Sequence, residues 1–160
     1  MEKRLRAPLL TFVRWPYIAA MTAPLHMMKL CVGAPHPEAL ERWQAERFGG
    51  GPAEHVTRMW PKRAEELLAG GSIFWVFKGT MLARQRLLDL QERVGPDGIT
   101  RCALILDPEV VRVAAVPRRA FQGWRYLPAA DAPGDLPAGR AAEGPLPPKL
   151  ARELAEMGLL

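Results

Sequence analysis

A run of large apolar residues lies in the middle of the chain, at residues 73–77, and reads IFWVF. Gly70 and Gly71 precede the run and Gly79 follows it. A short apolar run rich in β-branched and aromatic residues and bounded by glycines is typical of a strand that is covered on both faces. We therefore expect this strand to be the centre of the core.

The segments before this strand alternate between strand and helix patterns. Residues 27–32 predict a first strand. Pro37 is well placed to open a helix over residues 38–47, because a proline at the first helical position loses no hydrogen bond. Apolar residues recur there at steps of three and four, and we expect Trp43 to be a core anchor. A second short helix is predicted to begin at Pro61 and to end at Gly70.

The segments after the central strand have the alternating pattern of a sheet. Residues 80–94 are extended, but neither face is purely apolar, so we expect a bulge or a change from strand to turn near Arg86. A strong turn follows at residues 95–98. Residues 101–107 and 111–115 each alternate and are predicted to form a hairpin with one wet face. The order of elements predicts an α+β fold: a single small domain with a curled, mostly antiparallel sheet and short flanking helices.

The ends of the chain differ in character from the middle. We expect residues 1–20 to be an arm outside the fold, since their apolar part is too short to span a membrane. Residues 27–128 form the predicted core domain. Residues 129–148 are rich in proline and are predicted to be extended and loosely held. Residues 149–160 predict a C-terminal helix.

The net charge, the cysteines and the histidines bear on the ligands and the cell compartment that we expect. The net charge of +5 is shared between the first thirty residues and residues 54–128, which carry +4 each, while the remaining segments are slightly acidic. Cys31 and Cys102 lie in apolar runs with no C-x-x-C motif, which is typical of buried reduced thiols in a cytoplasmic protein. The three histidines do not stand at ligand spacing, so we expect no metal and no cofactor.

Several sequence blocks resemble a family of uncharacterised proteobacterial proteins, a domain of unknown function. The blocks span roughly residues 28–136 and read MKLCVGA, TRMWPKR, GGS-I-x-WV-x-KG, RQ, GITRC and PRR-x-FQGWRYL. The resemblance carries no activity over to this chain. The order of elements also resembles the PUA-like barrels, including the ASCH and EVE groups. That second resemblance implies a barrel as the alternative to the curled sheet, and RNA or a modified nucleobase as the ligand.

Two stretches combine arginines and lysines with aromatic rings. Rings and guanidinium planes stack on bases, and cations neutralise phosphates. We therefore predict a basic and aromatic cleft that binds RNA or a nucleotide, formed by Arg58, Trp60, Lys62, Arg63, Arg118, Arg119, Phe121, Trp124 and Arg125. The opposing interpretation is that the rings are core side chains and the arginines a solvated face.

Sequence features also favour two other functions, an amidohydrolase and a protein-interaction module. Lys62, with Glu65 or Glu66 and Thr57, contains residue types that look like those of some ASCH-type amidohydrolases. Lysine and glutamate three or four positions apart on a helix are more often an ordinary surface pair, which favours a protein that is not an enzyme. The proline-rich tail is the only feature that favours a protein-interaction module.

Overall fold

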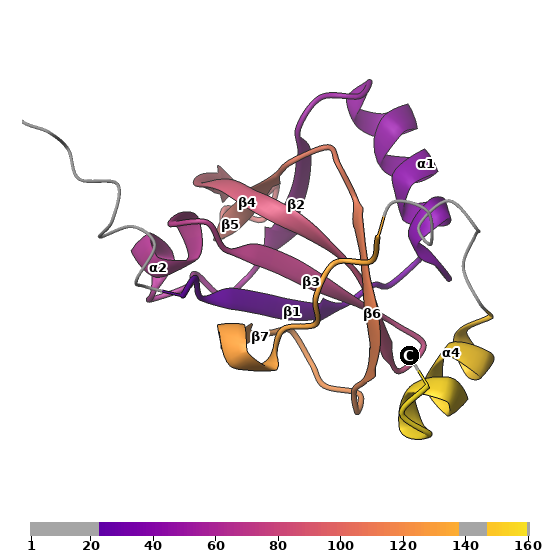
Figure 1. The fold of residues 1–160 in the computed structure, drawn as a ribbon. Coiled ribbons are helices and arrows are strands. Elements are labelled where there is room, and N and C mark those ends of the chain that lie inside the picture. Colours follow the sequence, from indigo (N-terminus) through magenta and orange to yellow (C-terminus); the bar gives the residue numbers. More distant parts are fainter. Residues whose placement is uncertain (1–22, 138–146, 160) are drawn as a thin grey trace, which may run out of the picture.

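A computed structural model describes residues 23–137 and 147–159, and the predicted arm at residues 1–20 lies outside this part. The fold is α+β, as predicted, with a seven-stranded sheet and short helices beside it (Figure 1). The strands are β1 (His26–Leu30), β2 (Ala53–Thr57), β3 (Ser72–Phe77), β4 (Thr80–Val94), β5 (Thr100–Leu106), β6 (Val111–Pro117) and β7 (Trp124–Leu127). The helices are α1 (Pro37–Phe48), α2 (Ala64–Leu68), α4 (Pro148–Glu156) and the 3₁₀ turn η1 (Ala129–Asp131).

The sheet is mostly antiparallel and open. Its order is β2-β5-β4-β3-β1-β7, β6 pairs with β4, and only the β1–β3 pair is parallel among the described strands. The described parts of the end strands β2 and β7 do not pair, so the curled sheet, rather than the closed barrel, is the predicted arrangement that is found. The register between β4 and β5 shifts between Leu87 and Asp89, which confirms the bulge predicted near Arg86.

The central strand β3 is buried along its whole length, as its sequence predicts. Ile73, Trp75 and Phe77 enter one apolar cluster, and Phe74 and Val76 enter a second cluster. Because successive side chains of a strand point to opposite faces, β3 supplies the core on both sides of the sheet.

A buried hydrogen-bond network joins α1 to the sheet. Gln85 of β4 is fully buried, and its Nε2 donates to Gln44 Oε1 (2.7 Å) and to the carbonyl of Asp107 (3.0 Å). Its Oε1 accepts from Trp75 Nε1 (2.9 Å) and from Gln44 Nε2 (3.1 Å). All four hydrogen-bonding positions of the Gln85 amide are filled, so the network places α1, β3 and β4 in one arrangement.

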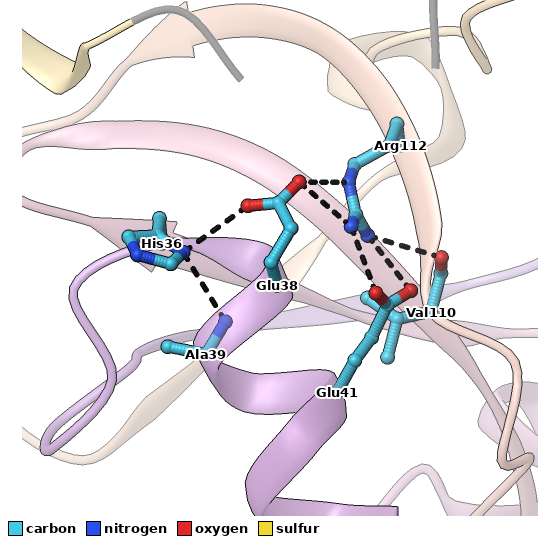
Figure 2. Close-up of polar contacts among 6 residues, drawn as sticks. All are labelled: His36, Glu38, Ala39, Glu41, Val110 and Arg112. Carbon is cyan, nitrogen blue, oxygen red and sulfur yellow. Dashed lines mark hydrogen bonds and ion pairs between the residues drawn. The ribbon is translucent and has the colours of Figure 1, made fainter. Parts of the chain in front are cut away.

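A second contact holds the first turns of α1 (Figure 2). Arg112 of β6 donates to Glu38 (2.9 Å) and to Glu41 (3.0 Å), while its side chain is only 13% exposed. His36 Nδ1 accepts the N–H of Ala39 (3.2 Å) and thereby caps the helix. The helix predicted over residues 38–47 is confirmed, and it ends where Gly49 adopts the left-handed conformation (φ 62°).

Three local predictions are wrong. Trp43 is 49% exposed, because Leu40 and Gln44 are the positions of α1 that face the core. The second helix begins at Ala64, not at Pro61; the chain before it is held by a tertiary contact in which Arg63 N donates to the Tyr126 hydroxyl (3.0 Å). The predicted hairpin is absent among the described strands, because β4 is long enough to pair with β5 and β6 in succession.

The two C-terminal segments both contact the sheet. The part of the proline-rich segment that the structure describes is not loose, since Ala114 N donates to Gly134 O and Leu136 N donates to Arg112 O, both at 2.9 Å. Residues 138–146 lie outside the described part. The predicted C-terminal helix is present as α4, which packs on β6 and β4 with Ala151 buried.

The buried amide network generates a stability prediction. Gln85→Leu leaves the Trp75 Nε1–H and the Gln44 amide without partners, and each unsatisfied buried group costs about 1–3 kcal/mol. We expect the free energy of unfolding in urea to fall by about 2–5 kcal/mol. The matched control is Gln91→Leu on the exposed part of β4. We expect its free energy of unfolding to stay within about 0.5 kcal/mol of the wild-type value. Equal losses in the two variants would contradict the role given to the network.

Candidate functional site

A pocket of about 320 Å³ opens where β1 leaves the sheet. Its floor and walls come from the end of β1 and the following loop (residues 29–34), from α1, from β2 and from β3. The side chains that line it beyond this loop are Leu40, Trp43, Gln44, Glu54, His55 and Trp75. Two of them, Gln44 and Trp75, belong to the buried amide network, so the pocket wall is held rigidly.

Strand register brings Lys29 between two tryptophans. Lys29 pairs with Trp75 on the parallel neighbour β3 and with Trp124 on the antiparallel neighbour β7. Lys29 is half-buried and forms no ion pair with the carboxylates of the described residues. A half-buried cation without a carboxylate partner favours an anionic or electron-rich partner.

His55 contributes a polar atom that the described chain does not satisfy. Its ring packs edge-on against Trp75, with the centroids 5.4 Å apart. Its Nε2 is buried and has no hydrogen-bond partner among the described residues. Burial, and secondarily the charge of Lys29, lower the pKa of His55 to about 4. The ring is therefore neutral at pH 7, and Nε2 can serve as a donor or as an acceptor, depending on the tautomer.

The other titratable groups of the pocket have assigned partners or are neutral. Glu54 accepts two hydrogen bonds from Arg93, at 3.0 Å each, so its charge is balanced. Burial raises the pKa of the Cys31 thiol to about 11, which keeps the sulfur protonated at neutral pH. Cys31 and Cys102 are both free thiols. Lys29 therefore sets the electrostatic character of the pocket.

The two stretches predicted to form a cleft contact each other. Trp124 Nε1 donates to the carbonyl of Met59 (3.0 Å), and the Arg63 guanidinium lies over the Tyr126 ring at 5.5 Å. Trp124 is buried, with 5% of its surface exposed, and so is Phe121, with 9%. Trp60 presents an exposed ring.

The nine predicted site residues are divided between two faces of the sheet. Trp124 belongs to the cluster on the pocket side, whereas Phe121 belongs to the cluster on the opposite side, where the Arg125 guanidinium lies 5.1 Å from its ring. The loop with Arg58, Trp60, Lys62 and Arg63 lies against the Trp124 face. Arg118 and Arg119 follow β6 and lie near the β3–β4 turn, where Arg118 N donates to Gly79 O (2.8 Å).

The lysine–glutamate pair considered for catalysis is not present. Glu66 is bound by Arg63, whose Nη2 lies 2.8 Å from Oε1, and Lys62 pairs with no carboxylate of the described residues. The described residues also contain no group of three or more His, Cys, Asp or Glu side chains placed to hold a metal ion. No helix among them is long and apolar enough to cross a membrane.

The residues of this pocket were not predicted from the sequence. Lys29 was the available signal, because it is the only charged residue in the apolar strand of residues 27–32. His55 had no such signal, since its burial follows from the packing of β2 against β5 and β3. A pocket built from four separate elements has no local pattern in the sequence.

The lowered pKa of His55 predicts a pH-dependent stability. Between about pH 6.5 and pH 4 the unfolded chain binds a proton that the folded chain does not, so stability falls as the pH falls. The pKa of His26 is also lowered, by burial and by Arg84, and acts in the same direction. We expect His55→Phe to recover on the order of 2 kcal/mol of the loss measured by urea unfolding between pH 6.5 and 4.5. An unchanged pH slope in this variant would show that His55 is not buried in the neutral form.

No curated protein and no solved structure matches the chain. The family comparison confirms the resemblance to an uncharacterised family and extends it to the last residue. The chain belongs to the family described as protein of unknown function DUF1489, whose family model matches residues 27–160.

Proposed function

We propose that this protein is a binding module for RNA or a nucleotide, and that one base enters the pocket beside His55. The observation that carries the proposal is the buried, unpartnered Nε2 of a neutral histidine in a pocket that also holds an unpaired lysine among the described residues. Buried polar groups normally have partners, so an unpartnered one in the lining of a pocket supports a ligand atom as its partner.

The lining of the pocket suits a nucleobase. Its volume of about 320 Å³ is at the lower end of small-molecule sites, which is the size range of a single base with part of its sugar. The exposed ring of Trp43 offers a stacking surface at the pocket. His55 Nε2 offers one hydrogen bond to a base edge, and Lys29 offers a charge to a carbonyl oxygen or a phosphate.

The basic loop beside the pocket gives the proposal a path for the sugar–phosphate backbone. Lys29 is next to Trp124 in register, and Trp124 in turn is bonded to Met59 of the loop. Arg58 and Lys62 in this loop are exposed and form no ion pair with described residues. Their charges are therefore available to phosphates. The two free cysteines are typical of a protein in a reducing compartment, so the proposal includes a cytoplasmic location.

Binding is tested by titration of the intrinsic tryptophan fluorescence with the four nucleoside monophosphates, and by anisotropy of labelled single-stranded RNA. We expect saturable binding whose affinity falls with salt concentration. His55→Phe keeps an aromatic ring, and Lys29→Met keeps an unbranched side chain. Each variant removes one polar contact, so we expect its affinity to fall roughly tenfold.

The matched control for these variants is Arg42→Ala, on the exposed side of α1 and outside the pocket lining. It removes one positive charge, as Lys29→Met does, and is expected to bind like the wild type. The proposal fails if neither a nucleotide nor RNA binds at low salt, or if the control loses as much affinity as the two pocket variants.

A further inference from the structure

The turn between β3 and β4 has an unfavourable residue at its tip. Lys78 and Gly79 form a two-residue hairpin with φ values of 47° and 86°, and the flanking residues Phe77 and Thr80 pair directly. Positive φ at both central positions is the type I′ turn, which favours Asn-Gly. Lys78 is the only non-glycine residue with positive φ in the described part of the chain. A lysine in this left-handed conformation is more strained than an asparagine would be.

Three further cations surround this turn. Arg118 N donates to Gly79 O at 2.8 Å, which holds Arg118 and its neighbour Arg119 against the hairpin. Arg152 of α4 approaches from another side, since its Nη1 lies 3.5 Å from the position that a Cβ on Gly79 would occupy. The cluster therefore draws on the β3–β4 turn, the segment after β6, and α4.

The charges of this cluster are not balanced within the described residues. Lys78, Arg119 and Arg152 are exposed, Arg118 is half-buried, and none forms an ion pair with a described carboxylate. The acidic residues of α4 are Glu153, which faces Lys149 at 3.9 Å, and Glu156, which is exposed at the last turn. Four cations without carboxylate partners, on segments that meet at one turn, favour a polyanion as ligand.

The cluster and the pocket lie at the same end of the sheet. β1 and β3 run parallel, Leu30 pairs with Val76, and Cys31 N donates to Val76 O at 2.9 Å. The loop at residues 31–34, which lines the pocket, therefore leaves the sheet at the end where Lys78 turns the chain.

We propose that Lys78, Arg118, Arg119 and Arg152 form a phosphate-binding site for single-stranded RNA whose base occupies the pocket. This inference rests on the proposed function and specifies it: the ligand is a strand of several nucleotides rather than a free mononucleotide. The base in the pocket supplies the specific contact, and the cluster adds to the salt-dependent part of the affinity that the basic loop begins.

The decisive variant is Lys78→Asn, because stability and binding should change in opposite directions. Asparagine suits the left-handed position, so we expect the melting temperature to rise by about 2 °C or more. Loss of one phosphate contact should lower RNA affinity roughly threefold and reduce the slope of log affinity against log salt by about 0.7. The double variant Arg118→Ala with Arg119→Ala should reduce that slope by about 1.4. Arg42→Ala, which removes a charge outside the cluster, is the control and should leave slope and affinity unchanged.

Ligand length separates this inference from the proposed function. Anisotropy is measured with labelled RNA strands of increasing length, with DNA strands of the same sequence as a second arm, and mononucleotide binding is measured by tryptophan fluorescence. We expect the cluster variants to weaken binding of long strands and to leave mononucleotide binding unchanged, whereas His55→Phe weakens both. Equal effects on RNA and DNA assign the cluster to the phosphates, and a larger effect on RNA adds a contact to the 2′-hydroxyl.

Three outcomes overturn the inference. If the cluster variants bind long RNA like the wild type while His55→Phe does not, the phosphate site is wrong and the pocket stands. If vesicles containing anionic lipid bind in a Lys78-dependent way and RNA strands do not, the cluster belongs to a membrane surface. If His55→Phe changes nothing and neither RNA nor nucleotides bind, both proposals fail.

Discussion

The buried amide of Gln85 is the interaction on which the arrangement of this protein depends. An amide with no access to water is stable only when both its hydrogens and both acceptor positions of its oxygen are used. Gln44 from α1, Trp75 from β3 and the backbone of Asp107 meet this requirement together. The helix cannot shift along the sheet without breaking these bonds, and the Arg112 contact at the first turn prevents it from tilting away.

The pocket is a direct consequence of this constraint. Gln44 and Trp75 form part of its wall, and Trp75 also supports the ring of His55. With α1 held above the end of β1, the space between them remains open beside Lys29. The two polar groups in it, a neutral imidazole and a lysine ammonium, are left without partners among the described residues by the same packing that buries them. This combination distinguishes the pocket from an ordinary gap in the core.

The arginines and lysines of the described residues fall into two groups, those in ion pairs with carboxylates and those without. Arg84, Arg93, Arg101 and Arg112 are used internally, each in an ion pair with a carboxylate. Arg63 is also in an ion pair, with Glu66. Of the described cations without a carboxylate partner, Arg58 and Lys62 lie in the loop before α2, and Lys78, Arg118, Arg119 and Arg152 belong to segments that meet at the turn at Lys78. The others lie elsewhere: Lys29, Arg42, Arg47, Arg86 and Arg125.

The sequence alone determined the α+β class, the buried central strand, the first helix and the bulge in β4, because each depends on local periodicity, on glycine and proline positions, or on burial of one long apolar run. It also singled out the two basic and aromatic stretches, whose residues the structure divides between two faces of the sheet. Only the tertiary structure decided that Trp43 is exposed, that β6 pairs with β4, and that Lys29, His55 and Trp75 meet in one pocket. These outcomes depend on strand register and on a buried amide that links residues far apart in the chain, and no local pattern encodes such a meeting.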